Sequence, residues 1–480
     1  MRLAMPAFAP DTAADALRSR LGRPWPLAVL TTAIALAVYA PTVARDLSWA
    51  GAATDGGELI TASFTLGVPH PPGYPTYVVL GKLFSLLPLG TVAFRYNLFS
   101  AVCAALAAGL LAAVIRVHWG ERVRPTVAAA AALTFACLPL VWSQAVVAEV
   151  YALNLLVVAA LVLAWVSRGP VAVVGLLLGL AVTTHPTSLL MLPAALLGTR
   201  QGRGRLLAGF ALGLLPLLLL PWLARGDSPV VWGRPDTLGG WWWLVSGRLY
   251  AANLRLPFDG LWLDGPRLAA LLRALALGPG ALLVGRRPAM EPARHAADTT
   301  GRSRRTRLMA ATAALYTLFA LAYATSDAAV LLPPGLLLLA AVLAPGLEQA
   351  GKLALALPLA LAVVGLAGHT GAVGPSPRAL AVTALDTAPP HAVLLTPGDR
   401  SLFTLWYFHH VEGLRPDVVL VDANLLPFDW YRSRLAEQQP DLFVPDADDL
   451  PAFAQSNARA RPVCAVSLAA TPPTVLCTEE

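Results

Sequence analysis

The chain has 480 residues, of which 57% are hydrophobic and only 13% charged, and its mean hydropathy is +0.63. Average globular chains carry about 25% charged residues, and a soluble protein this apolar would expose surface patches that aggregate. The composition therefore excludes an ordinary soluble protein and predicts a polytopic α-helical membrane protein. The formal net charge of +7 does not indicate nucleic-acid binding, because the arginines stand in short clusters between apolar segments, which is the positive-inside pattern.

The first half of the chain is predicted to cross the membrane seven times. Residues 1–24 hold Arg18, Arg20 and Arg23 and are expected in the cytoplasm, followed by an uncleaved first span rather than a signal peptide. The expected spans are 25–44, 97–115, 126–141, 150–167, 170–183, 187–199 and 206–223. The fifth and sixth of these are short, so a tilted pair and a broken helix both remain open.

Two external loops are expected between these spans and those that follow. Loop 45–96 contains an apolar stretch, 77–89, that is too short to span and is expected to lie at the membrane interface. Loop 224–265 is rich in tryptophan, which indicates either a headgroup anchor or a wall for a lipid substrate.

The second half adds four predicted spans and a terminal domain. The spans are 266–284, 308–325, 328–345 and 352–369, and the arginine-rich loop 285–307 between the first two is expected in the cytoplasm. About eleven crossings in the transmembrane domain 25–370 place the C-terminal tail outside the membrane, opposite the N-terminus.

The C-terminal tail, residues 378–480, has a different composition. Segments 393–396 and 418–422 are predicted as buried strands, and a helix is expected from Gly398 to Tyr407. This strand–helix–strand pattern predicts a small extracytoplasmic α/β domain. Cys464 and Cys477 form a disulfide if the tail is exposed to an oxidising compartment, and the sequence leaves that pairing open.

The first external loop carries a pair of carboxylates, Asp55 and Glu58. Because they are three residues apart, one helical turn places both on the same face. Charged groups at a membrane are costly and usually functional. Gly56 and Gly57 between them would let the backbone approach a ligand closely. The competing interpretation is that Asp55 simply caps a helix.

Other polar residues at the external ends of the spans are candidates for substrate binding or catalysis. Glu149 precedes a span, where it either takes part in catalysis or only complements the helix dipole. His70 and His185 each precede a proline and could donate to a phosphate or a sugar hydroxyl. Arg95 suits phosphate recognition or headgroup anchoring. The remaining candidates for substrate binding are Tyr74, Asn97, Gln144, Tyr151 and Asn154.

Three runs of sequence resemble a known family. They are Asp-Gly-Gly-Glu-Leu-Ile at 55–60, Leu-Gly-Val-Pro-His-Pro-Pro-Gly-Tyr-Pro-Thr-Tyr at 66–77 and Phe-Arg-Tyr-Asn-Leu-Phe-Ser at 94–100. These runs resemble a family once described as a domain of unknown function, whose animal members are transmembrane protein O-mannosyltransferases of the GT-C superfamily. The resemblance is dense over about the first 200 residues and returns in the tail, for example at 405–407 and 415–418.

The resemblance implies a GT-C-like fold and an inverting glycosyltransferase. Such an enzyme takes a hexose, mannose in the animal relatives, from a polyprenyl-phosphate carrier outside the membrane, and a carboxylate of the first external loop assists the acceptor. Asp55 is the expected base with Glu58 as its partner or substitute, and the sequence does not decide between them. The acceptor is a protein Ser/Thr hydroxyl or a glycolipid, and membrane lipids are the surrounding partners.

The donor is expected to be lipid-linked, with no cofactor and no metal. The chain has neither a Gly-rich nucleotide loop nor an Asp-x-Asp motif in a soluble domain. The alternative function is a polytopic transporter or lipid flippase, which would place ionisable groups near the bilayer midplane. The Ala/Leu/Arg-rich composition is typical of a GC-rich bacterial genome, so a multi-pass protein of the plasma (inner) membrane is expected.

Overall fold

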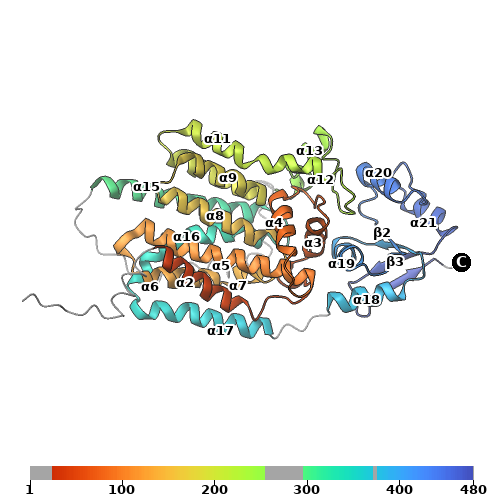
Figure 1. The fold of residues 1–480 in the computed structure, drawn as a ribbon, viewed down its shortest axis with the longest axis horizontal. Coiled ribbons are helices and arrows are strands. Elements are labelled where there is room, and N and C mark those ends of the chain that lie inside the picture. The colour runs from red at the N-terminus through yellow and green to blue at the C-terminus, as the bar shows by residue number, and fades with distance from the viewer. Residues whose placement is uncertain (1–23, 255–295, 371–375, 479–480) are drawn as a thin grey trace, which may run out of the picture.

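The computed structural model describes residues 24–254, 296–370 and 376–478. A bundle of helices makes up one side of the molecule and a small sheet with its own helices makes up the other (Figure 1). Helices α3 and α4 lie where the two parts meet. The predictions for residues 1–23, for the span 266–284 and for Trp262 fall outside the described residues.

Each predicted span within the described residues coincides with an apolar helix or with a broken pair. The bundle consists of α2 (Pro24–Tyr39), α5 (Val92–Trp119), η2 (Gly120–Arg122), α6 (Pro125–Ala136), α7 (Pro139–Ala145), α8 (Val150–Val166), α9 (Val171–Thr184), η3 (Pro186–Met191), α10 (Leu192–Gly198), α11 (Arg203–Gly213), η4 (Leu215–Leu219), α12 (Leu220–Leu223), α15 (Ala296–Ala322), η8 (Ala328–Leu331), α16 (Pro333–Glu348), η9 (Gly351–Leu355) and α17 (Ala356–Thr370).

The structure does not confirm the predicted number of about eleven membrane crossings. Among the described residues, two helical stretches are individually long and apolar enough to cross a bilayer, Val92–Arg122 and Arg203–Leu223. Helices α6 and α7 would make a third span if counted together, although they bend by 71° where α7 begins at Pro139. Proline lacks the N–H that would continue the helix, which explains this break. The other apolar helices are shorter than a full crossing.

Small residues allow the helices of the bundle to pack closely. Helices α9 and α11 lie side by side (Figure 1), and a Cβ placed on Gly209 would come within 2.0 Å of the Ala172 carbonyl oxygen. Close backbone contact of this kind is the usual way in which membrane helices associate, because lipid provides no hydrophobic drive between them.

The two external loops contain short helices and are joined to each other. The first loop forms η1 (Ala50–Ala52), α3 (Gly56–Phe64) and α4 (Pro75–Ser85), and the second forms α13 (Leu238–Val245) and η5 (Arg248–Asn253). Val68 N–H donates to the Val230 carbonyl at 2.9 Å, and Trp232 N–H donates to the Val68 carbonyl at 3.0 Å. These bonds hold the Trp-rich loop against the loop that carries Asp55 and Glu58.

The tail forms a four-stranded sheet with flanking helices, and its first two strands lie at the predicted positions. Its elements are α18 (Pro377–Thr387), β1 (Val393–Thr396), α19 (Asp399–Trp406), η10 (Tyr407–Val411), β2 (Val419–Asp422), α20 (Asp429–Gln438), α21 (Leu450–Ala458), β3 (Val463–Ser467) and β4 (Thr474–Cys477). The strand order is β2-β1-β3-β4, with β1 parallel to β2 and β3 and with β4 antiparallel to β3. The sequence did not predict β3 and β4, whose Cys464 and Cys477 form a disulfide.

The tail docks on the first external loop through α3 and α19. A Cβ on Gly57 would lie 2.2 Å from the Phe403 carbonyl oxygen, so only glycine permits this contact. The prediction that Gly56 and Gly57 admit a ligand is therefore corrected. Gly57 admits the backbone of α19, and a Cβ on Gly56 would meet the Ala148 carbonyl.

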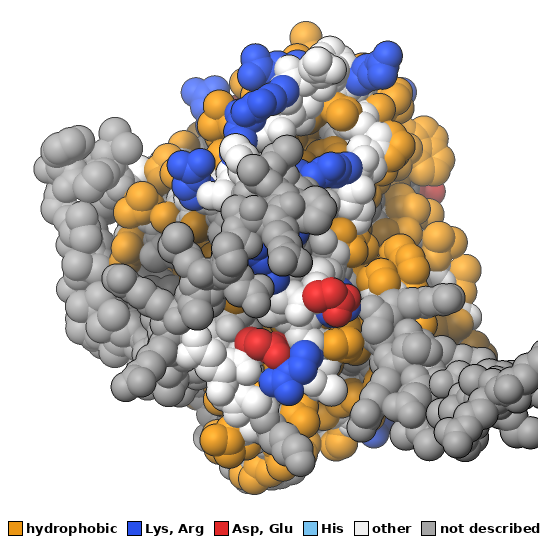
Figure 2. Space-filling view, turned by 90° about the vertical axis from the view of Figure 1, so that its left-hand side faces the viewer, with side chains coloured by type: hydrophobic (Ala, Val, Ile, Leu, Met, Phe, Trp, Pro, Cys, Tyr) orange, Lys and Arg blue, Asp and Glu red, His pale blue; other side chains and the backbone are white. Residues whose placement is uncertain are grey.

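The opposite end of the bundle carries a cluster of arginines. Figure 2 shows Lys and Arg side chains spread over the end face that lies farthest from the sheet. Arg168, Arg302 and Arg305 line a pocket at the cytoplasmic turns predicted from the sequence. The two ends of the bundle thus differ in charge as the positive-inside pattern requires.

Candidate active site

Asp55 and Glu58 stand at the start of α3 but in different environments. Asp55 precedes the helix, and its side chain makes no capping hydrogen bond. Its side chain is 37% exposed, whereas the side chain of Glu58 in the first turn is completely buried. Asp55 is therefore the carboxylate that a substrate can reach.

His70 connects the two carboxylates. Glu58 Oε1 accepts a hydrogen bond from the His70 backbone N–H at 2.7 Å, and Glu58 Oε2 contacts His70 Nδ1. On the other side of the ring, Nε2 lies 3.8 Å from Asp55 Oδ2 and 3.2 Å from the Tyr74 hydroxyl. Glu58 thus fixes the orientation of the imidazole, whose second nitrogen faces Asp55 and Tyr74.

The electrostatics of this group favour a charged histidine beside a carboxylate that titrates near neutrality. Burial opposes the charge on His70, but Glu58 and Asp55 outweigh it and raise the pKa of His70 to about 10. Part of the Asp55 side chain is accessible, but protein groups replace most of the water around it. The resulting loss of solvation raises the pKa of Asp55 to about 6, although the charge of His70 acts in the opposite direction. At neutral pH His70 carries a proton and Asp55 is mostly ionised.

Glu149 lies on the same side of the bundle. It precedes α8 and is 4% exposed, and its side chain makes no capping hydrogen bond. Burial, followed by the negative charge of Asp55, raises the pKa of Glu149 well above its ordinary value. The two carboxyl groups therefore affect each other's protonation, which fits a shared site better than simple complementation of the helix dipole.

Aromatic and imidazole rings extend the site from His70 toward the bundle. Tyr74 stacks on His185 with ring centroids 6.1 Å apart. The ring of Tyr151 also contacts His185, with ring centroids 5.4 Å apart. The structure therefore brings together seven of the eleven predicted site residues: Asp55, Glu58, His70, Tyr74, Glu149, Tyr151 and His185.

The side chains of the other four predicted site residues donate hydrogen bonds to other groups of the protein. Arg95 binds the Ser85 and Leu89 carbonyls, and Asn97 binds the Ala44 and Asp46 carbonyls. Gln144 donates to the Gly51 carbonyl, and Asn154 donates to the Thr184 and Ser188 hydroxyls. These contacts position the loops around the site, so direct contact of these four residues with a substrate stays a prediction.

Three residues of the site come from segments that sequence reasoning did not connect to it. The rings of Trp232 and Tyr250 lie 6.3 Å and 6.2 Å from the His70 ring, and the charge of Asp327 acts on Asp55 and Glu149. The tryptophan-rich loop was the sequence feature that could have indicated a role for Trp232 and Tyr250. Asp327 stands between two predicted spans at their external end, and only that position could have indicated that it belongs to the site.

The sequence of the chain is similar to one family over two separate regions. Residues 55–201 match the model for the protein O-mannosyl-transferase TMEM260 N-terminal domain, and residues 377–442 match TMEM260-associated domain 2. The mouse protein O-mannosyl-transferase TMEM260 is 28% identical over 483 residues, covering 88% of this chain and 67% of the mouse protein. A relative of the same description from Dictyostelium discoideum is 41% identical over 56 residues, 11% of this chain and 7% of the relative.

The fold is similar to that of a solved membrane protein. The crystal structure of ArnT from Cupriavidus metallidurans bound to undecaprenyl phosphate superposes with a TM-score of 0.56 and 14% identity, covering 91% of this chain and 92% of that one. The similarity to ArnT is a similarity of fold. The two matched regions and the mouse relative identify a glycosyltransferase that is similar to the protein O-mannosyl-transferases, as the resemblance in its external loop and its tail indicated.

Proposed function

We propose that the chain transfers mannose from a polyprenyl-phosphate carrier to the hydroxyl group of a protein serine or threonine, with inversion at the sugar. The observation that carries this proposal is the accessible Asp55, which is free of any capping bond and lies 3.8 Å from the buried His70–Glu58 pair. Support for the acceptor comes from the mouse relative, a protein O-mannosyl-transferase. Support for the carrier comes from ArnT, whose structure holds undecaprenyl phosphate.

The residues of the site suit the two proton and charge movements of this reaction. Asp55 accepts the proton of the acceptor hydroxyl while the hydroxyl oxygen attacks the anomeric carbon. The bond from that carbon to the phosphate oxygen breaks, and the leaving polyprenyl phosphate keeps the electron pair. The charged His70 stabilises the negative charge that develops there. Glu58 keeps His70 protonated and oriented, and Glu149, whose protonation is coupled to that of Asp55, is a further catalytic candidate.

The proposed topology has about eleven spans in a plasma membrane, with the N-terminus in the cytoplasm and the tail outside. Three features support it. The arginine-rich face and the candidate site lie at opposite ends of the bundle (Figures 1 and 2). The helices follow the predicted spans, and the Cys464–Cys477 disulfide suits an oxidising compartment.

The alternative, a transporter or lipid flippase, fits the position of the charged groups less well. Transporters hold their ionisable residues near the bilayer midplane, often at broken helices. Here Asp55, Glu58 and His70 lie on and beside α3, at the end of the bundle next to the sheet (Figure 1). A glycosyltransferase that meets its acceptor outside the membrane needs its base at that end.

The test is sugar transfer by the purified full-length chain in nanodiscs. Radiolabelled polyprenyl-phosphate mannose is the donor and a bacterial envelope protein extract is the acceptor. A nucleotide-linked mannose is tested in parallel as an alternative donor. The expected result is label on protein that is released by alkaline β-elimination, from the lipid-linked donor alone. Label on glycolipid instead would overturn the protein acceptor, and no transfer from any polyprenyl-linked sugar would overturn the proposal.

A further inference from the structure

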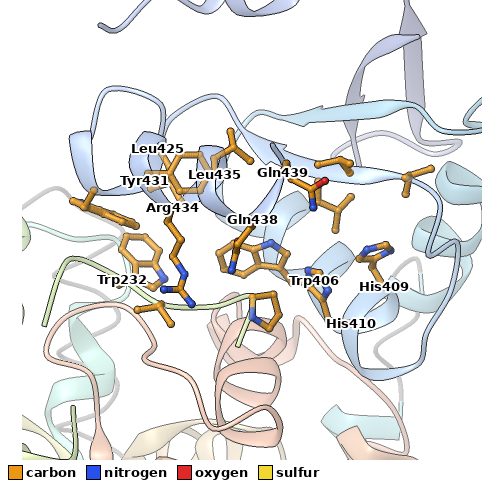
Figure 3. Close-up of a pocket in the computed structure, with 16 residues that line it drawn as sticks. Trp232, Trp406, His409, His410, Leu425, Tyr431, Arg434, Leu435, Gln438 and Gln439 are labelled. Carbon is orange, nitrogen blue, oxygen red and sulfur yellow. The ribbon is translucent and has the colours of Figure 1, made fainter. Parts of the chain in front are cut away.

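Two pockets outside the candidate active site differ greatly in size. The pocket in the tail, between Trp232, Trp406 and Tyr431 (Figure 3), has a volume of about 80 Å³, which is well below the size of an ordinary ligand site. The pocket at the end of the bundle farthest from the sheet has a volume of about 560 Å³, which lies in the usual range. The larger pocket is therefore the better candidate for a second binding site.

The larger pocket lies where three helices come together. Helices α5 and α8 end on this side of the bundle and α15 begins there (Figure 1). The described residues that line the pocket are Val117, His118, Val166, Ser167, Arg168, Arg302 and Arg305. Three of these residues are arginines and none is Asp or Glu, so this part of the wall has a single sign of charge.

The arginines outweigh the negative charge of the helix ends. Helices α5 and α8 both turn their C-termini toward the pocket, and each helix C-terminus acts as about −0.5 of an elementary charge. The three guanidinium groups each carry a full positive charge, so the described wall remains clearly positive. A guanidinium group binds phosphate through paired N–H donors, which makes a phosphate-bearing anion the ligand that suits this wall.

The backbone at Arg168 indicates that an arginine is specifically placed there. Gly169 N–H donates to the Ala164 carbonyl at 2.9 Å and Arg168 N–H donates to the Trp165 carbonyl at 3.3 Å, which makes the end of α8 a Schellman motif. Arg168 occupies its left-handed position with φ 56°, where glycine is usual and a residue with a Cβ is strained. Backbone strain is thus tolerated at a residue whose side chain lines the pocket.

The pocket lies at the level expected for lipid headgroups. The apolar part of α15 begins at Leu308, within two turns of Arg302 and Arg305, and α8 is apolar up to Val166. Phosphate groups of phospholipids lie at such boundaries between apolar helices and basic residues. Val117, which lines the pocket and is 37% exposed, offers apolar surface to the adjoining part of a lipid.

We propose that this pocket binds the phosphate group of an anionic phospholipid, with Arg168, Arg302 and Arg305 as the binding residues. A zwitterionic lipid such as phosphatidylcholine also carries a phosphate, but its quaternary ammonium group is repelled by the three arginines. The inference is independent of sugar transfer, because the pocket lies at the end of the bundle opposite the candidate base (Figure 1).

The experiment measures lipid binding to the full-length protein in a non-ionic detergent by native mass spectrometry. Dioctanoyl phosphatidylglycerol is the anionic probe and dioctanoyl phosphatidylcholine is the zwitterionic one. We expect phosphatidylglycerol to bind at least about tenfold more tightly, since hydrogen bonds to charged groups are strong. Arg302→Gln with Arg305→Gln should lose most of this preference. Arg200→Gln with Arg205→Gln removes the same charge from exposed positions outside the described lining and should keep it.

Arg168→Gly separates lipid binding from folding. Glycine adopts the left-handed conformation without strain, so this variant should melt no earlier than the unmodified protein when no lipid is added. It should nevertheless bind phosphatidylglycerol more weakly, because one of the three guanidinium groups is gone.

Several results would overturn the inference. They are equal affinity for the two lipids, full binding of phosphatidylglycerol by Arg168→Gly or by the Arg302/Arg305 variant, and an equal loss in the Arg200/Arg205 control, which would indicate binding to diffuse charge. Inorganic phosphate and glycerol 3-phosphate are added as competitors. Displacement of phosphatidylglycerol by either at comparable concentration would overturn a lipid as the occupant and identify a soluble phosphate compound instead.

Discussion

The two ends of the helical bundle differ in the burial and pairing of their charged side chains. At the end next to the sheet, Glu58 and His70 are buried and compensate each other, with Asp55 beside them. At the other end, arginines outnumber the carboxylates on the face that Figure 2 shows. Buried pairs of opposite charge shift pKa values and support chemistry, whereas exposed charges of one sign mainly set orientation in the membrane. The comparison predicts that substitutions at the first end alter catalysis and those at the second do not.

The largest effect is expected from Asp55→Asn. This change keeps the size of the side chain and removes its ability to accept a proton. Sugar transfer should fall by about 10²–10⁴-fold, the usual contribution of a general base. The measurement is the initial rate of mannose transfer, and Asp441→Asn in the exposed part of the tail is the control. Transfer at the unmodified rate by a folded Asp55→Asn protein would remove Asp55 from the role of base.

Glu58→Gln tests how much the buried Glu58–His70 contact contributes to the stability of the protein. The substitution leaves a charged His70 without its buried partner, and breaking such a pair costs about 3–5 kcal/mol. The melting temperature should fall clearly, as followed by a thiol-reactive dye that reports exposure of the buried Cys103 and Cys137. Glu437→Gln on exposed α20 is the control and should melt like the unmodified protein. Equal melting of the two variants would show that the Glu58–His70 contact contributes little to stability.

The smallest effect is expected at the arginine end. A double change, Arg302→Gln with Arg305→Gln, removes two positive charges from the pocket they line with Arg168. Both side chains are half-buried at the end of the bundle farthest from Asp55, and charge interactions near a surface are worth about 0–1 kcal/mol, so transfer should change by less than about fivefold. A loss of transfer comparable to that of Asp55→Asn, with the tail still accessible to protease from outside, would contradict the separation of roles between the two ends.

The sequence predicted the positions of the helices and of the first loop well. Apolar length and arginine clusters located most described helices of the bundle, because both are local properties of the chain. They did not predict that α15 begins at Ala296, inside the expected arginine-rich loop, or that α7 continues to Ala145. The carboxylate pair and His70 were found because they are close in sequence. The lengths of the spans were less predictable, since prolines such as Pro139 break a continuous apolar run into a bent pair.

The parts that were missed depend on contacts between distant segments. Trp232, Tyr250 and Asp327 reach the site only through folding of the second external loop and of the loop after α15. The role of Gly57 was misjudged for the same reason, because its close neighbour is Phe403 of the tail. Strands β3 and β4 were missed since short strands next to loops have little periodicity of their own.

The most direct test of the account is the pH dependence of kcat/KM for mannose transfer in the unmodified protein and in Glu58→Gln. The base must be ionised, so activity should rise with pH through about 6, the pKa of Asp55. The imidazole must be charged, so activity should fall as pH rises through about 10, the pKa of His70.

In Glu58→Gln the negative charge that contributes most to raising the pKa of His70 is gone, so the alkaline limb should move to lower pH by more than about one unit. That shift would show that the buried carboxylate controls the charge of the imidazole beside the base. An alkaline limb at the same pH in both proteins, or a rate that does not change across pH 6, would contradict the account.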